Sequence, residues 1–555
     1  MAEPASDLRV ITSQVIAALI KNLLLIIIGM GSAYPTILIP ALIVDSNFMI
    51  NKEETSWIGS VNLVTVLVGA CLSGAFTQRL GRKRFMQILT IPLFTCWIIF
   101  RFATYIWQIF ISLTLYGLTQ GLIEASIMSY VAEVTQPRVR GMLVATNALS
   151  IILGVLIEFG LGTLLSWRDA AAVSSILPLV AFVVLFFIPE SPHWLVMRHK
   201  LSKARKSLAW LRGWTTVEMV ENEFSEMCRN HKVNYDNVYQ SSDAICFKTN
   251  LKNANKFLKK NFCWPFSIVS LTCFLAVFTG TWTLQTYAVA IFDTFDVPMN
   301  HYRATLTLGV VQFLGCVFYV ILLRYYGKRM LSFVSLCSSA AITLALGIYA
   351  YKENATYLVF RDKNDSTTDL QSMNWIPLVL ILCLAFIGQC GTRGLPWTLI
   401  GEVFSHETRA TGCGLVSAVF YGFAFAANKS FLKMTDSLTV PVVFWINCGI
   451  NLFGFIILYY VLPETEGRSL QEIIDHFSGI SKLDNKVKRT VNLRMVQKFT
   501  GHTVGLICFN TLSLLAGGNN DNRTRHKLRQ DKMRVTGCFL YQVQLKLDVS
   551  NINQQ

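Results

Sequence analysis

Two carboxylate and guanidinium pairs recur in the 555-residue sequence with the same internal spacing. Glu133 is followed seven residues later by Arg140, and Glu402 is followed seven residues later by Arg409. Carboxylates and guanidinium groups form strong, charge-assisted hydrogen bonds, and a guanidinium group also stabilises the negative C-terminal end of a helix. The chemistry that these residues predict is an electrostatic clasp between a helix end and the next element.

Two other motifs repeat in the same order as the Glu and Arg pairs. LGRKRF at Leu80 has a counterpart in YGKRML at Tyr326, and IPESPHWL at Ile188 has one in LPETEGRSL at Leu462. Their offsets are 246 and 274 residues, close to the 269 residues that separate the two glutamates. Three matched pairs in one order predict two structurally equivalent halves.

The composition places these halves in a membrane. Apolar residues make up 53% of the chain and charged residues only 15%, which is typical of a membrane protein. A helix that spans the hydrocarbon core needs about 20 apolar residues. Twelve segments qualify, which predicts an all-α membrane protein with two six-helix halves: 16–40, 57–77, 85–104, 107–131, 142–165, 170–188, 264–291, 304–323, 331–351, 375–400, 411–434 and 440–462.

Basic residues predict the orientation of the chain, because Lys and Arg collect in cytoplasmic loops. The stretch 189–261 holds 13 basic and 7 acidic residues, and the tail from Asp475 holds 13 and 5. Both termini are therefore expected in the cytoplasm, and the positive charge is attributed to topology and anionic lipid rather than to nucleic acid. The expected parts are an N-terminus 1–15, a first half 16–188, a central loop 189–263, a second half 264–462 and a tail 463–555 that is disordered after about 482.

The segments outside the spans carry weaker signals. Residues 201–227 have the pattern of short amphipathic helices. Asn354 and Asn364 begin glycosylation sequons in a loop expected outside the cell. The start of the chain has no cleavable signal pattern, so the first span is expected to stay in the mature protein. The cysteine spacing predicts free thiols, with no metal site and no cofactor.

The charged residues of the repeats form the set expected to control conformation. A clasp that closes in only one of two global states biases their equilibrium, and a partly exposed ion pair contributes about 0.2 to 1 kcal/mol. Several pairs are therefore needed. The alternative is that each is a solvated loop charge that serves only topology. The set comprises Arg79, Arg82, Lys83, Glu133, Arg140, Glu190, Lys328, Arg329, Glu402, Arg409 and Glu464.

Taken together, these motifs resemble a known family. GRK after the second span, PESPHWL after the sixth, Pro396-Trp397 in the tenth and PETEGRSLQEI after the twelfth are similar to the sugar-porter branch of the major facilitator superfamily. SAYPTIL and ANKSF are similar to insect members that resemble trehalose transporters. The resemblance covers residues 15 to 475 and implies a plasma-membrane carrier that works by alternating access.

The residues at the substrate site depart from the family pattern. The resemblance implies two Gln and an Asn in the seventh span, where this chain has Ala276, Val277 and Trp282. It implies further amides at Ala148 in the fifth span and near Phe420 in the eleventh. The remaining candidates for substrate binding are Gln285, Gln312, Gln389, Trp397 and Trp282. The alternatives are hydrogen bonds between helices for the amides and packing or interfacial anchoring for the tryptophans.

Four ionisable residues lie unusually deep in the expected spans: Glu124, Glu158, Arg393 and Lys429. A charge at the centre of a bilayer costs about 2.5 to 3.5 kcal/mol on insertion scales, so each should face a cavity or a partner. The first span lacks the acidic residue that the resemblance associates with proton coupling, and Leu113 replaces the corresponding arginine of the fourth span. Passive uniport is therefore expected.

The sequence thus predicts a carrier of a sugar-like solute, such as a hexose or trehalose. Two alternatives remain open: a sugar sensor that keeps the fold without transporting, and a carrier of another small organic solute. The absence of the expected amides from the seventh span favours these alternatives, and the matched clasps favour transport. An enzyme is not expected, because the chain has no recognisable nucleophile and base, metal cluster or phosphate loop.

Overall fold

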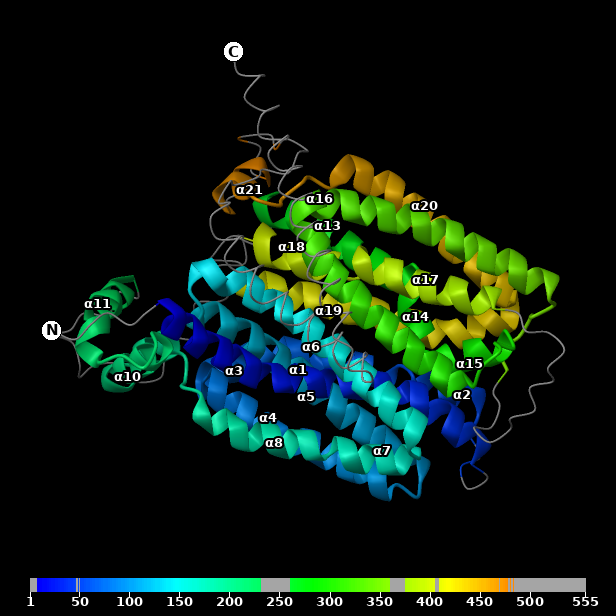
Figure 1. Cartoon of the computed structure of the whole chain (residues 1–555), viewed down its shortest axis with the longest axis horizontal. Coiled ribbons are helices and arrows are strands. Elements are labelled where there is room, and N and C mark those ends of the chain that lie inside the picture. Colours follow the sequence, from blue (N-terminus) through cyan, green and yellow to red (C-terminus); the bar gives the residue numbers. More distant parts are fainter. Residues whose placement is uncertain are drawn as a thin grey trace, which may run out of the picture. The chain divides into compact units, whose positions relative to one another are not determined.

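The long helices agree with the expected membrane spans. The structure is a computed structural model that describes residues 7–45, 48, 50–230, 260–359, 375–404, 409–468, 470–477, 480 and 483. Every regular element in these ranges is a helix (Figure 1). Eleven helical segments of the described chain are long and apolar enough to cross a membrane. They match eleven of the twelve expected spans, and the exception is the expected span 264–291.

The first six spans follow in the expected order, and two of them are interrupted. They are α1 (Asp7–Val44), α2 (Lys52–Ile58) with α3 (Val61–Leu80), α4 (Arg82–Phe102), α5 (Ile106–Val134), α6 (Pro137–Leu164), and α7 (Trp167–Ser174) with α8 (Ile176–Val184) and the 3-10 turn η1 (Leu185–Phe187).

Small residues let these helices pack backbone to backbone. Gly29 on α1 faces Gly154 on α6, and a Cβ atom on Gly29 would lie 2.0 Å from the carbonyl oxygen of Ile151. Gly69 on α3 meets Gly121 on α5 in the same way. Larger side chains at these contacts would force the helices apart.

The second half contains the broken helices. The expected seventh span is divided into α13 (Lys260–Phe278), α14 (Thr281–Thr286) and α15 (Ala288–Thr294). The other elements are α16 (His301–Lys352), which includes a non-helical Gly327, α17 (Ile376–Cys390), α18 (Leu395–Val403), α19 (Arg409–Leu438) and α20 (Val440–Val461). The expected seventh span is therefore present as three consecutive helices.

Gly280 explains the first break. Its φ of 90° is left-handed, and a Cβ atom would lie 2.6 Å from Nδ2 of Asn447. Only glycine adopts this conformation without strain.

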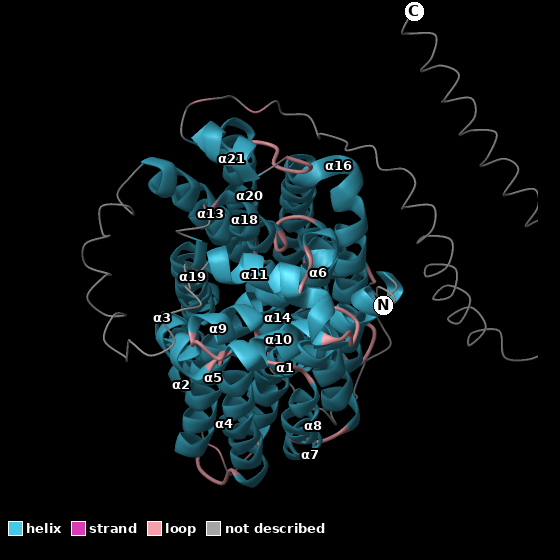
Figure 2. Ribbon diagram, turned by 90° about the vertical axis from the view of Figure 1, so that its left-hand side faces the viewer, coloured by secondary structure: helices cyan, strands magenta, loops and turns pink. Residues whose placement is uncertain are grey.

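Short helices lie at the end of the bundle where α1 begins. They are α9 (Pro192–Met197), α10 (Leu201–Leu211), η2 (Val217–Val220), α11 (Glu221–Asn230) and α21 (Leu470–Phe477). Figure 2 views the molecule from this end. Leu208 and Phe224 are buried in a separate apolar cluster there, so the amphipathic helices expected between 201 and 227 are confirmed. The tail after Leu483 lies outside the described residues.

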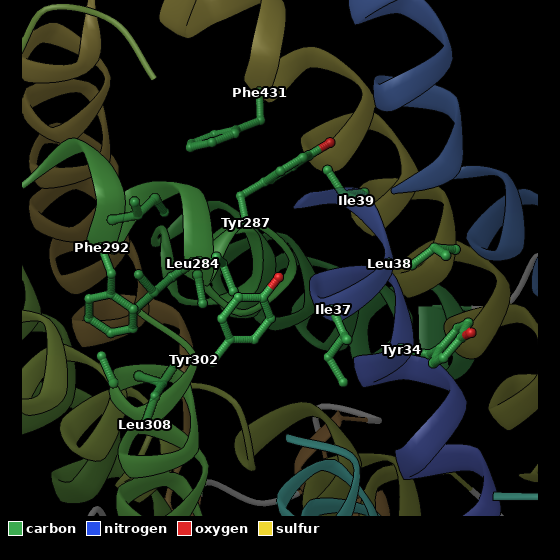
Figure 3. Packing of buried hydrophobic residues seen from close by; sticks show 14 of the residues in the cluster. Tyr34, Ile37, Leu38, Ile39, Leu284, Tyr287, Phe292, Tyr302, Leu308 and Phe431 are labelled. Carbon is green, nitrogen blue, oxygen red and sulfur yellow. The ribbon is translucent and has the colours of Figure 1, made fainter. Parts of the chain in front are cut away.

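One apolar cluster joins the two halves near the opposite end of the helices. Tyr34, Ile37 and Leu38 of α1 belong to the same buried cluster as Leu284 of α14 and Phe431 of α19. Figure 3 shows these labelled side chains on their separate helices. Within the second half, Tyr287, at the junction of α14 and α15, stacks on Phe431 with ring centroids 5.1 Å apart. The shared cluster packs the two halves together on this side.

Candidate functional site: charge clamps and a polar centre

The first clamp comprises Arg82, Glu133, Glu190 and Ser191. The guanidinium of Arg82, at the start of α4, donates to Oε1 of Glu133 at 2.8 and 3.2 Å. Ser191 donates its hydroxyl to the other carboxylate oxygen of Glu133. Glu190 accepts the backbone N–H groups of Lys83 at 2.9 Å and Arg84 at 3.2 Å. A carboxylate here stabilises the positive N-terminal end of α4.

The second clamp comprises Lys328, Glu402, Glu464, Thr465 and Glu466, and it repeats this arrangement. Glu464 accepts the backbone N–H groups of Lys328 at 3.2 Å and Arg329 at 3.0 Å. The ammonium of Lys328 lies 2.6 Å from Glu402 and 2.9 Å from Glu466. Thr465 donates to Glu402 at 2.9 Å, as Ser191 does to Glu133.

The flanking basic residues use backbone carbonyls. The Lys83 ammonium donates to the carbonyl of Phe186 at 3.1 Å, and Arg329 donates to that of Tyr459 at 2.6 Å. Arg79 contributes its own carbonyl, which accepts from Arg198 at 3.2 Å. The side chains of Arg140 and Arg409 lie outside the described part of the structure. The described contacts of each clamp therefore connect elements of a single half, and the sequence reasoning missed Arg82 as the partner of Glu133.

A buried arginine occupies the polar centre of the second half. Arg393 lies in the turn between α17 and α18, and its Nη2 donates to Oε1 of Gln285 at 2.8 Å. Its guanidinium also lies 5.0 Å from the ring centroid of Trp282. Nη1 of Arg393 is buried without a hydrogen-bond partner. The sequence identified these three residues separately but not their mutual contact.

Gln312 and Gln389 each bury an unused acceptor. Gln312 on α16 is 1% exposed and Gln389 on α17 is 7% exposed. The Oε1 atoms of both carboxamides have no hydrogen-bond partner. An unsatisfied buried amide costs free energy, which a hydroxyl donor from a bound solute would recover.

Aromatic rings connect this centre to the other half. Trp397 on α18 and Trp282 on α14 both contact the ring of Phe420 on α19, with centroids 5.1 and 5.2 Å apart. The next residue, Tyr421, donates its hydroxyl to Glu124 of α5 at 3.1 Å. Gln120 of α5 donates to the same hydroxyl at 3.3 Å. Glu124 thus has a partner in the second half, as its depth in the span requires.

The other deep ionisable residues also have partners. Glu158 is fully buried and accepts from Ser174 at 2.9 Å. The ammonium of Lys429 lies 2.7 Å from Glu53 and 4.1 Å from the ring centroid of Trp57. The pair of Lys429 and Glu53 connects the halves beside the apolar cluster, and Lys52 with Asp436 forms a second such pair at 3.0 Å.

The comparisons with known proteins identify this architecture. A profile described as "Sugar (and other) transporter" matches residues 32–477, more than half of the chain. The facilitated trehalose transporter Tret1 of Polypedilum vanderplanki is 27% identical over 476 residues, which are 85% of this chain and 89% of that protein. Tret1 of Bombyx mori is 26% identical over 486 residues, covering 87% and 90% of the two chains.

Solved structures show the same fold. The partially occluded, inward-open conformation of the xylose transporter XylE from E. coli has a TM-score of 0.65 and 16% identity, and covers 82% of this chain and all of that one. XylE bound to 6-bromo-6-deoxy-D-glucose, a major facilitator superfamily protein, has a TM-score of 0.64 and 18% identity, and covers 83% and 98%. The chain therefore has the major facilitator fold and belongs to the Sugar (and other) transporter family.

Proposed function

We propose that this protein carries a sugar across the plasma membrane by facilitated uniport. The family match and the two repeated halves support a carrier. The observation that supports a hydroxyl-rich solute is the pair of unused carboxamide oxygens on Gln312 and Gln389. Trp282 and Trp397 supply flat apolar walls of the kind that pack against the C–H face of a sugar.

Alternating access follows from the contacts between the halves. With the termini in the cytoplasm, the apolar cluster and the ion pair of Lys429 with Glu53 close the outer side. These contacts must separate when the carrier opens outward. The clamps stay within the halves, so each half moves as a rigid body. Exposed Asn354, in the turn after α16, is placed outside in this orientation, and glycosylation at Asn354 with loss in Asn354→Gln would support it.

Uptake into vesicles that contain the purified protein tests this proposal. The panel contains hexoses, a pentose, trehalose and a hexuronate, and we expect saturable uptake of at least one. Preloading the vesicles with unlabelled solute should accelerate the entry of labelled solute, because a carrier exchanges faster than it returns empty. The absence of saturable uptake for every sugar in the panel would refute the proposal.

Uniport is tested in the same vesicles with an imposed pH step of one unit. Such a step supplies about 1.4 kcal/mol for each proton moved. We expect the final internal concentration of a neutral sugar to equal the external one with and without this step. Accumulation driven by the step would indicate proton coupling, with Glu124 and Glu158 as the first residues to test.

A second candidate is a sugar sensor with the same fold. Trp282 favours it, because this ring and Arg393 occupy the region where the resemblance implies substrate-binding amides. A sensor would bind a sugar without exchanging it across the membrane. Saturable binding to the purified protein, combined with no exchange in vesicles, would therefore favour the sensor over the carrier.

A further inference from the structure

We propose that the polar centre binds a sugar carboxylate, such as a hexuronate, with Arg393 as the counter-ion of the carboxylate. The inference rests on the proposed function and narrows its substrate to a class that carries one negative charge.

The guanidinium of Arg393 has a neutral environment among the described residues. Nη2 donates to the carboxamide oxygen of Gln285, and the cation lies over the Trp282 ring. Nη1 is buried without a hydrogen-bond partner. None of the ion pairs found in the described ranges includes Arg393. A neutral amide and an aromatic face stabilise the cation only partly, and they leave its charge uncompensated.

Two other deep cations show what distinguishes Arg393. Lys429 has the carboxylate of Glu53 as a partner. Lys21 is completely buried and donates to Asn147, so a solute does not reach it. Arg393 is partly exposed although it lies in the middle of a broken span. Its Nη1 is buried in this conformation, so a carboxylate reaches it only when the halves move apart.

The geometry of the centre matches a carboxylate on a polyhydroxylated body. A guanidinium group presents parallel N–H donors that fit the two oxygens of a carboxylate. Gln312 and Gln389 offer acceptors for hydroxyl groups, and Trp282 and Trp397 offer apolar walls. A single cation balances a monoanion, which favours a carboxylate over a doubly charged phosphate.

Binding to the purified protein tests the inference directly. Glucuronate and glucose differ mainly at one carbon, and we expect glucuronate to bind at least 10-fold more tightly. Arg393→Gln should abolish this preference, and Arg393→Lys should retain part of it. Arg303→Gln is the matched control, because it removes the same charge from an exposed position at the start of α16. Equal affinities for the two solutes in the unaltered protein would overturn the inference.

Transport under a membrane potential gives an independent test. At equilibrium a uniporter accumulates a monoanion about 50-fold at 100 mV, positive inside, and a neutral sugar not at all. The equilibrium ratio depends on the charge of the solute and not on that of the protein. We expect glucuronate to show this accumulation. Saturable glucose uptake without glucuronate uptake would overturn this inference and leave the proposed function standing. Failure of every sugar to bind or enter would overturn both.

Discussion

The carboxylates of Glu190 and Glu464 hold equivalent helix starts in the two halves. Each accepts two consecutive backbone N–H groups shortly after a glycine with positive φ, Gly81 at 95° and Gly327 at 77°. The repeat in the sequence thus corresponds to a repeated capping contact in space.

Replacing either capping carboxylate with glutamine should lower the thermal stability of the protein. Glu190→Gln and Glu464→Gln remove the negative charge from a helix N-terminus and leave one acceptor for two N–H groups, which costs about 0.5 to 2 kcal/mol. The melting temperature in detergent measures this loss. Glu226→Gln, at an exposed position of α11, is the control, and equal melting temperatures for all three variants would contradict the capping role.

Lys328→Met should be the most destabilising change at the clamps. Lys328 is 1% exposed and contacts both Glu402 and Glu466, so its loss leaves two carboxylates without their cation. Removing one partner of a fully buried ion pair costs about 3 to 5 kcal/mol, and the loss here should be smaller because the side chains of Glu402 and Glu466 are 37% and 25% exposed. Adding Glu402→Gln and Glu466→Gln to Lys328→Met should restore part of the melting temperature. A triple variant that melts below the single variant would show that the loss is not electrostatic.

Arg140→Ala and Arg409→Ala should slow transport without weakening solute binding. Both residues are at the cytoplasmic ends that are expected to control conformation. We expect reduced uptake rates with unchanged dissociation constants, measured on the same preparation with Arg303→Ala as control. Weaker binding at an unchanged rate would place these arginines in the substrate site instead.

Gln312→Leu and Gln389→Leu should weaken the apparent affinity for the transported solute. Leucine keeps most of the side-chain volume but leaves a solute hydroxyl without its acceptor, at a cost of about 1 to 3 kcal/mol. This corresponds to roughly 5-fold to 150-fold weaker affinity. The affinity of each variant is measured only for the molecules that reach the membrane, so that poorer folding does not alter it. A structural role alone predicts poorer folding with normal affinity in the molecules that reach the membrane.

The ion pair between Glu53 and Lys429 should oppose outward opening. Glu53→Lys places two cations together and should increase labelling of an external-side cysteine probe, while Glu53→Lys with Lys429→Glu should return the labelling rate to its original value. An exposed ion pair contributes little, so the expected change in labelling rate is only a few-fold. Identical labelling of both variants would exclude this role.

The sequence was sufficient for the order of the spans and for eleven of the twelve, because hydropathy is averaged over many residues. It did not predict that Glu133 would meet Arg82, since a seven-residue spacing indicates only neighbours along one or two helices. The break at Gly280 lies inside the expected seventh span, and a hydropathy average over about 20 residues does not locate it. The contact between Arg393 and Gln285 joins residues 108 positions apart, which no local pattern reports.

The confinement of each described clamp contact to one half has a thermodynamic consequence. A contact that is intact in both the inward and the outward state contributes equally to the two and cancels from their equilibrium constant. Changes at Glu190 or Lys328 should therefore lower the stability of the protein and leave the equilibrium between its inward and outward states unchanged. That equilibrium should instead depend on contacts between the halves, such as those of Tyr421 with Glu124 and of Lys429 with Glu53.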